Sequence, residues 1–249
     1  MVSHDSDSFN SAWRIIALSV IFILSSQFTL KHSLTYRGIA SDLVSGQVYF
    51  TEEHEEFLTD ERLPELTLIQ YKNPEGKIIV RKKIDYTHHT YHPDFIQEDL
   101  RDGYLEGAKA VGDEIELIHR KNNKKSIQTK RVRIPEPAVV DGGFNYFLKS
   151  RWDNLLSGKE IKFNFAVPSQ LTYYSFRVHK VHDETNKEKH VVVFKMEPDS
   201  LILRALASPI YLYYNVDTKR LMRYEGITTI NDAWGKSFSA KIVYPIIGP

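Results

Sequence analysis

Cysteine is absent from this chain of 249 residues, and its absence removes several kinds of site at once. Without it there is no disulfide, no thiolate metal ligand, no cysteine nucleophile and no lipidated cysteine of the bacterial lipoprotein type. The lack of disulfides does not argue against export, because a domain of this length can be stabilised by its core alone. The cellular compartment must therefore be inferred from the N-terminus.

An excess of charge of one sign is also lacking, since 33 lysines and arginines face 32 aspartates and glutamates. No global field directs the chain toward nucleic acid, so we expect no nucleic-acid partner. The sequence has no G-x-S-x-G, no G-x-x-x-x-G-K and no G-x-G-x-x-G after a strand, and it indicates no cofactor. Catalytic groups can converge from distant strands, so these absences lower the expectation of an enzyme without excluding one.

An apolar run lies near the N-terminus, where Ile15 to Leu24 read I-I-A-L-S-V-I-F-I-L. This length is typical of an export signal, because a membrane-spanning helix usually needs about 20 apolar residues. Cleavage after Ser26 would put Leu24 where a small residue is preferred, so an uncleaved anchor is the alternative. We predict that residues 1–30 are an export signal or an N-terminal membrane anchor. The remainder would then be extracytoplasmic, in the periplasm, and either secreted or held at the inner membrane by residues 15–30.

Apolar residues alternate with polar ones through most of the chain after residue 46, a pattern typical of antiparallel strands. The clearest case is Ile161, Phe163, Phe165 and Val167. Polar turns predict hairpins at residues 73–76, 121–125, 183–188 and 215–219. Strands joined by such short turns pair with their neighbours, so the sheet should be mostly antiparallel.

Three short helices are expected between the strands. Phe144, Leu148, Trp152 and their neighbours recur at helical spacing, after a glycine pair and before Gly158. A second helix is predicted near residues 201–207, and a third, shorter one at residues 94–101.

The absence of any linker rich in proline, glycine or serine favours one antiparallel β-rich domain over residues 37–249. A sheet with one apolar face and few helices must curl around those helices or pack on a second sheet. We predict a mainly β fold. It would be a single curved antiparallel sheet, or a half-open barrel, with two or three short helices packed on its concave face. A closed barrel and a sandwich are the alternatives.

Three segments of the C-terminal half carry a resemblance. They are V-D-G-G-F-N-Y-F-L-K-S-R-W-D-N-L-L-S-G-K-E-I-K-F-N-F-A-V-P (140–168), P-I-Y-L-Y-Y-N-V-D-T-K-R-L-M-R-Y-E-G-I-T-T-I-N-D (209–232) and A-K-I-V-Y-P (240–245). Their pattern resembles uncharacterised proteobacterial periplasmic β-rich proteins of unknown function, and is loosely similar to the curved sheet of the lipoprotein-localisation carriers. The resemblance implies a fold and a compartment, and no reaction.

Histidines gather in Y-T-H-H-T-Y-H, where His88, His89 and His92 could ligate zinc or another borderline metal. The flanking threonines and Pro93 favour a loop, in which His89 points away from the other two. No H-E-x-x-H pattern and no fourth ligand are identifiable. A metal-assisted enzyme using these three histidines is one functional hypothesis, and solvated loop histidines are the alternative.

Two charged clusters invite a functional interpretation. Residues 51–56, T-E-E-H-E-E, suggest general acid/base chemistry, but an exposed edge strand protected by its charges is favoured. Lysines and arginines crowd one hairpin at Lys121, Lys124, Lys125, Lys130, Arg131 and Arg133. This basic patch is expected to be a solvated hairpin tip, with binding of an anionic envelope component as the alternative.

The favoured function is that of a non-enzymatic cell-envelope protein that binds a lipid, a lipoprotein or another hydrophobic partner on its concave sheet face. The residues predicted to line this face are Phe144, Leu148, Trp152, Phe163, Phe165, Tyr211 and Tyr213. Phe144, Leu148, Trp152 and Leu155 should face the sheet and meet Phe163, Phe165 and Ile242. Besides the metal-assisted enzyme, an envelope scaffold or adaptor without a ligand cavity is the remaining hypothesis.

Overall fold

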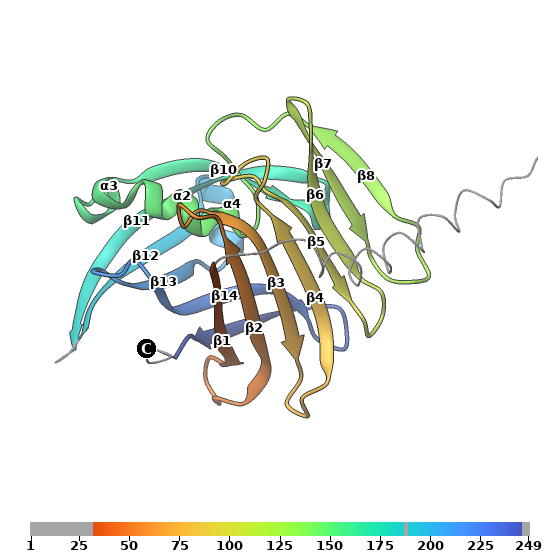
Figure 1. Cartoon of the computed structure of the whole chain (residues 1–249), viewed down its shortest axis with the longest axis horizontal. Coiled ribbons are helices and arrows are strands. Elements are labelled where there is room, and N and C mark those ends of the chain that lie inside the picture. Colours follow the sequence, from red (N-terminus) through yellow and green to blue (C-terminus); the bar gives the residue numbers. More distant parts are fainter. Residues whose placement is uncertain (1–31, 187–188, 246–249) are drawn as a thin grey trace, which may run out of the picture.

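The computed structural model of the chain describes residues 32–186 and 189–245 (Figure 1). The predicted export segment, residues 1–30, lies outside the described residues. Within them, no helix is both long enough and apolar enough to cross a bilayer.

The described residues form one sheet of fifteen strands. Its N-terminal half consists of β1 (His32–Asp42), β2 (Val48–Leu58), β3 (Pro64–Lys72), β4 (Ile78–Asp85), β5 (Asp94–Asp99), β6 (Leu105–Val111), β7 (Glu114–Arg120) and β8 (Gln128–Val132). Its C-terminal half consists of β9 (Ala138–Val139), β10 (Ile161–Val167), β11 (Thr172–Asn186), β12 (Lys189–Pro198), β13 (Ile210–Asn215), β14 (Leu221–Asn231) and β15 (Ser237–Val243). Neighbouring strands pair antiparallel except β9 and β10, which are parallel. The hairpins predicted at 73–76, 121–125 and 215–219 are confirmed, and β11 pairs with β12 as the fourth predicted hairpin requires.

The order of the strands is unusual, because the first and last strands meet in the middle of the sheet. β1 pairs with both β2 and β15, so each half runs outward from this junction, to β8 at one edge and to β9 at the other. Only residues 133–137 connect the two edges, which requires the sheet to curl strongly. The 3₁₀ helix η2 (Pro168–Gln170) accordingly touches β6 and β7. The edge strands do not pair, so the prediction of a single curved, half-open sheet is confirmed and a closed barrel or a sandwich is excluded.

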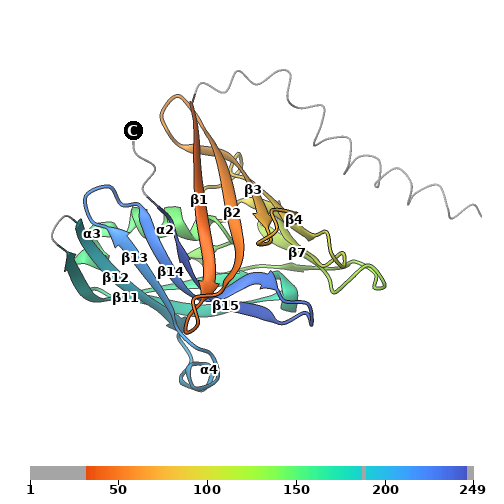
Figure 2. The same ribbon diagram turned by 90° about the horizontal axis from the view of Figure 1, so that it is seen from below.

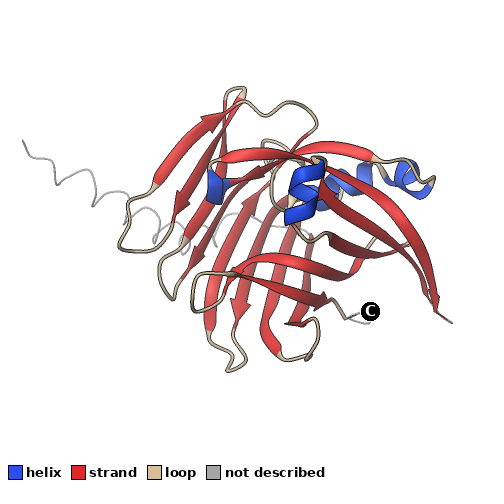
Figure 3. Cartoon of the chain, turned by 180° about the vertical axis from the view of Figure 1, so that it is seen from behind, coloured by secondary structure: helices blue, strands red, loops and turns tan. Residues whose placement is uncertain are grey.

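The predicted helix after the glycine pair forms as two pieces, α2 (Gly143–Ser150) and α3 (Trp152–Leu156), which are separated at Arg151. Figure 3 shows these helices beside the curved strands of the C-terminal half. They bury Phe147, Leu148, Trp152 and Leu155 against that half. The remaining helix, α4 (Leu201–Leu206), lies where it was expected but buries none of its residues.

The helix predicted at residues 94–101 is wrong, because residues 94–99 form β5. Phe95, Gln97 and Asp99 alternate with exposed residues and are all buried. A strand whose buried face carries two polar side chains does not show the hydrophobic alternation that identifies strands in a sequence.

Candidate functional site

The space under α2 and α3 is filled by side chains. Leu148 and Phe163 are buried, and Trp152, only 3% exposed, has its ring 5.5 Å from that of Phe194 and 5.6 Å from that of Tyr214. This cluster, called the helix core below, comprises Val139, Phe147, Leu148, Trp152, Leu155, Phe163, Val178, Val192, Phe194, Met196, Leu212 and Tyr214. Its composition is almost wholly apolar.

Five of the seven residues predicted to bind a ligand belong to the helix core or pack against it: Phe144, Leu148, Trp152, Phe163 and Phe165. The structure does not bring the other two to them, because Tyr211 and Tyr213 alternate with the buried Leu212 and Tyr214 and so point to the opposite face of β13. Ile242, expected under the same helix, instead belongs to a second core, which joins β15 to the strands of the N-terminal half.

The three histidines of residues 88–92 do not converge on one point. His88 is exposed, while the rings of His89 and His92 stack with their centroids 3.5 Å apart. The backbone N–H groups of Tyr91 and His92 donate to Nδ1 of His89 at 3.0 and 3.3 Å, so that nitrogen is already engaged. No group of three or more His, Cys, Asp or Glu side chains that could hold a metal ion occurs in the described part of the chain. The hydrogen bonds of His89 fix the loop that leads into β5.

Charged and polar side chains cross the concave face of the N-terminal half in a single row. Strand pairing puts Tyr36, His54, Ile69, Lys82, Gln97 and Glu106 directly opposite one another from β1 to β6. All except Ile69 carry a polar group, and these five residues are called the polar row below. Directly opposed residues point to the same face of a sheet, so the row lies inside the fold.

The prediction that residues 51–56 form an exposed edge strand is wrong. They lie in β2, which is paired on both sides, and Glu52 is 4% exposed. Glu52 and His54 share one face of β2, and that face is the inner one. Because the sheet curls over it, these side chains acquire the buried setting that a flat edge strand would lack.

The polar row is tied to the rest of the fold by hydrogen bonds. Lys82 Nζ lies 2.8 Å from Asp141 Oδ2, just before α2. Burial alone lowers the pKa of Lys82, but the Asp141 carboxylate more than offsets this and the pKa is raised. Gln97 donates through Nε2 to the carbonyl oxygen of Thr229 at 3.0 Å, and its Oε1 accepts from the Thr229 hydroxyl at 3.0 Å. The interior polar groups thus join β4 and β5 to the far wall of the fold.

Glu106 ends this network on β6. It accepts hydrogen bonds from Gln97 at 3.3 Å and from the Tyr104 hydroxyl at 3.0 Å. Burial raises the pKa of the Glu106 carboxyl to about 7, because Lys82 and the hydrogen bond from Tyr104 offset the loss of water only in part. Glu106 therefore changes its charge near neutral pH.

Glu52 is the centre of a second group of contacts. Its Oε1 accepts hydrogen bonds from the Tyr244 hydroxyl at 2.5 Å and from His54 Nε2 at 2.9 Å. Burial opposes its ionisation, yet His54, Tyr244 and Lys82 together lower the pKa of the Glu52 carboxyl, so it is ionised at neutral pH. Nδ1 of His54 is buried and has no hydrogen-bond partner among the described residues.

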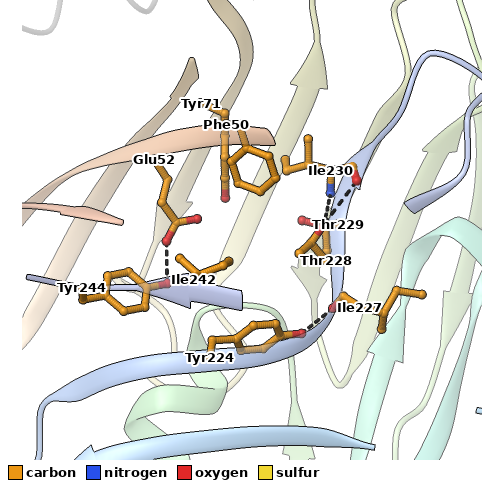
Figure 4. Close-up of a pocket in the computed structure, with 10 residues that line it drawn as sticks. All are labelled: Phe50, Glu52, Tyr71, Tyr224, Ile227, Thr228, Thr229, Ile230, Ile242 and Tyr244. Carbon is orange, nitrogen blue, oxygen red and sulfur yellow. Dashed lines mark hydrogen bonds between the residues drawn. The ribbon is translucent and has the colours of Figure 1, made fainter. Parts of the chain in front are cut away.

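A cavity of about 180 Å³ opens beside Glu52, between β2–β3 and β14–β15 (Figure 4). Its lining residues are Phe50, Glu52, Tyr71, Tyr224, Ile227, Thr228, Thr229, Ile230, Ile242 and Tyr244. In Figure 4 the Glu52 carboxylate and the Tyr71 hydroxyl both point into the space between these walls. No hydrogen bond reaches Oε2 of Glu52 from any described residue.

One wall of the cavity exists because β14 departs from regular pairing. Ile227 pairs with Ser239 and Asn231 with Ser237, so the strand bulges between these two pairs. The bulge is held by Thr228, whose hydroxyl donates to the Ile230 carbonyl at 3.2 Å, and by the Tyr224 hydroxyl, which donates to the Ile227 carbonyl. Bulges of this kind re-aim side chains: here Ile230 is buried, and Thr229, although exposed, reaches the buried Gln97 with its hydroxyl.

Gly38 of β1 provides the floor on which Glu52 and Tyr244 lie. A Cβ atom at this position would stand 2.8 Å from Glu52 Cγ and 2.9 Å from Tyr244 Cε1, closer than side chains pack. Sequence reasoning missed Gly38, Tyr71 and Tyr244 as site residues. The Tyr244–Glu52 contact joins residues 192 positions apart, so no local pattern could reveal it.

The basic patch lies at the β8 edge of the sheet and at the β7–β8 turn. Its six predicted members are exposed, and two are partly neutralised, Arg131 by Glu116 and Arg133 by Asp113. Lysine and arginine along an edge strand hinder pairing with another chain. This arrangement gives no support to an adaptor that works through its sheet edges.

Comparison with known proteins returned no match, whether to a protein-family model, to a curated protein or to a solved structure. The resemblance to periplasmic β-rich proteins stays a prediction. The function must therefore be inferred from the cavity and the buried charges around it.

Proposed function

We propose that the chain is a non-enzymatic binding protein of the cell envelope that holds a small amphipathic ligand in the cavity beside Glu52. One observation carries the proposal: an ionised carboxylate, 4% exposed, borders unfilled space and leaves Oε2 without a hydrogen bond from any described residue. Buried charges are normally paired or hydrogen-bonded throughout. A ligand with a cationic or hydrogen-bond-donating group would supply the missing partner of Glu52 Oε2.

The size of the cavity favours a ring-sized apolar body. Its volume is about 180 Å³, close to the roughly 150 Å³ of an engineered apolar cavity that binds benzene. Sites for larger ligands usually measure about 300–1,000 Å³. A ring, or the short apolar end of a larger lipid, therefore fits better than a whole acyl chain.

The charges around the cavity favour a cation. Lys82 is paired with Asp141, and the contacts of Glu52 with His54 and Tyr244 are both made through Oε1, which leaves Oε2 of the carboxylate toward the space. Tyr71, Tyr224 and Tyr244 add aromatic walls, and cations bind well to such rings once water is removed. An aromatic or cyclic amine has both the ring that fits the volume and the positive charge that fits Glu52.

The envelope is the proposed compartment because of the apolar run Ile15–Leu24 and its position at the N-terminus. Native mass spectrometry of the full chain, purified from its natural host without detergent, tests for a ligand acquired there. We expect an adduct of small mass that is lost from Glu52→Gln. A clean apo mass for the unchanged chain would count against the proposal.

Titration with benzylamine and with benzyl alcohol tests the ligand chemistry directly, since the two differ in charge but hardly in shape. We expect calorimetry to give tighter binding of benzylamine, and Glu52→Gln to remove its advantage over the alcohol. Glu225→Gln is the matched control, because Glu225 lies on β14 outside the cavity and pairs with Arg223. Equal binding of the two probes, or the same loss in both variants, would reject Glu52 as the recognition group.

A further inference from the structure

The short helix α4 exposes its apolar side chains to solvent. It connects β12 to β13 and projects beyond the sheet in Figure 2. Leu201, Ile202 and Leu206 are 76%, 75% and 79% exposed. Burying an aliphatic side chain of this size stabilises a protein substantially. Three such side chains exposed on a helix of six residues therefore indicate a surface that makes contact with another molecule. These three residues are called the α4 tip below.

The α4 tip is held outward by a buried charge cluster at its base. Glu197, at the end of β12, has a nearly buried side chain and pairs with Arg177 at 2.5 Å, with Lys195 at 2.7 Å and with Arg204 of α4 at 3.4 Å. Arg204 lies on the same helix as the tip. The helix is therefore attached to the fold through its polar residue, while Leu201, Ile202 and Leu206 are exposed.

We propose that the α4 tip inserts into the interfacial layer of a phospholipid bilayer. Its apolar surface consists of three side chains, far fewer than the roughly 20–30 residues that each partner contributes to a stable protein interface. It has no tryptophan or tyrosine, the residues that dominate protein hot spots, in which leucine is under-represented. A bilayer accepts aliphatic side chains without a complementary shape.

The residues around α4 fit the same surroundings. Lys162, whose side chain is 63% exposed, lies at the base of α4 and pairs with Asp199, just before the helix, at 3.1 Å. Long basic side chains can lie along an apolar surface and keep their charge among lipid headgroups. The insertion is independent of the Glu52 cavity, which lies inside the sheet.

Attachment through α4 is distinguishable from attachment through the N-terminus. In Figure 2 the start of β1 and α4 lie at opposite ends of the molecule. A probe on α4 therefore reports contact of that helix, even if residues before His32 hold the chain to a membrane. The absence of cysteine makes such a probe easy to place, because a single introduced cysteine is the only site of labelling.

The experiment uses the full chain with Ile202→Cys, labelled with the environment-sensitive dye NBD, and vesicles of phosphatidylcholine and phosphatidylglycerol. We expect brighter, blue-shifted emission when vesicles are added. The control is Leu63→Cys, a position 60% exposed between β2 and β3, at the end of these strands away from α4, where the same dye should stay in water. Vesicle flotation is measured in parallel for both proteins.

A second variant removes the apolar tip without touching the core. Leu201→Ser with Leu206→Ser, in the labelled Ile202→Cys chain, should abolish the blue shift, whereas Trp234→Ser, at a position 89% exposed in the β14–β15 turn, should leave it unchanged. Flotation of the protein with the dye at position 202 still in water would overturn the proposal, as would no flotation at all. A blue shift that grows with protein concentration in the absence of vesicles would also overturn it, because the occupant would then be a second copy of the chain.

Discussion

The two halves of the sheet fill their concave faces with different chemistry. In the C-terminal half, two short helices seal the helix core with aromatic and aliphatic side chains. In the N-terminal half η2 and Tyr146 of α2 touch the apolar core, and the polar row is closed over by β14, by the Asp141 loop and by the bulge at Thr228. An unfilled volume in an apolar core lowers the stability of the protein. Buried polar groups, in contrast, each require a particular hydrogen-bonding or charged partner. The candidate cavity lies on the polar side.

The largest expected effect tests whether the helix core is a packed core or a movable cover. Trp152→Ala removes a ring that contacts Phe194 and Tyr214, and it should lower the free energy of unfolding by about 3–5 kcal/mol. Denaturant unfolding measures the loss. A loss below about 1 kcal/mol would mean that α2 and α3 lift off the sheet, and the contrast between the halves would disappear.

The second prediction tests the buried ion pair between Lys82 and Asp141 in the polar interior of the N-terminal half. Lys82→Met leaves the largely buried Asp141 carboxylate unpaired, and should lower the free energy of unfolding by about 3 kcal/mol. Lys82→Met combined with Asp141→Asn should be more stable than the single variant, because no unpaired charge remains. Arg133→Ala is the control: it breaks the pair with Asp113, in which both side chains are at least 70% exposed, and should cost less than about 1 kcal/mol. If Lys82→Met and Arg133→Ala lower the free energy of unfolding equally, the buried ion pair is no more important for stability than the exposed one.

The smallest effect depends on pH. Burial raises the pKa of Glu106 from 4.5 to about 7, so the native state keeps this proton to a higher pH than the unfolded chain. The stabilising contribution of the protonated form is complete below about pH 4.5 and is lost as the pH rises through about 7, a change of about 3 kcal/mol at most. Glu106→Gln has no such proton to lose. The difference in free energy of unfolding between the two proteins should therefore shift in favour of the variant across this range, and a constant difference would contradict the raised pKa.

The strands and most hairpins were predictable because alternation and turn residues are local signals. The Asn73–Gly76 turn illustrates this: Gly76 adopts the positive φ that such a turn requires, and β3 and β4 pair on either side of it. The helix at 144–155 was predictable for the same reason, apart from the break at Arg151. For α4 the position was predictable but not the exposure of its leucines.

The candidate site was not predictable, because it arises from curling. The residues Glu52, His54 and Gln97 are polar, and polar positions of a strand are ordinarily assigned to the solvent side. In this fold the sheet curls until such a face is inside, and the side chains find partners on β14 and beyond the end of β15, more than 130 residues away in the chain. The pattern showed which residues share a face. It did not show which face becomes the interior.

The junction of β1 with β15 has a consequence for how the molecule is made. Ile39 pairs with Val243, so the two outward-running halves become one sheet only when the last strand is in place. Contacts between residues so distant in the chain are slow to form, because loop closure precedes any gain from the contact. A chain that is still being synthesised therefore exposes the open edge of β1 until its last strand has been made. Shortening the C-terminus by a single strand would leave two separate meanders, each with an unprotected edge.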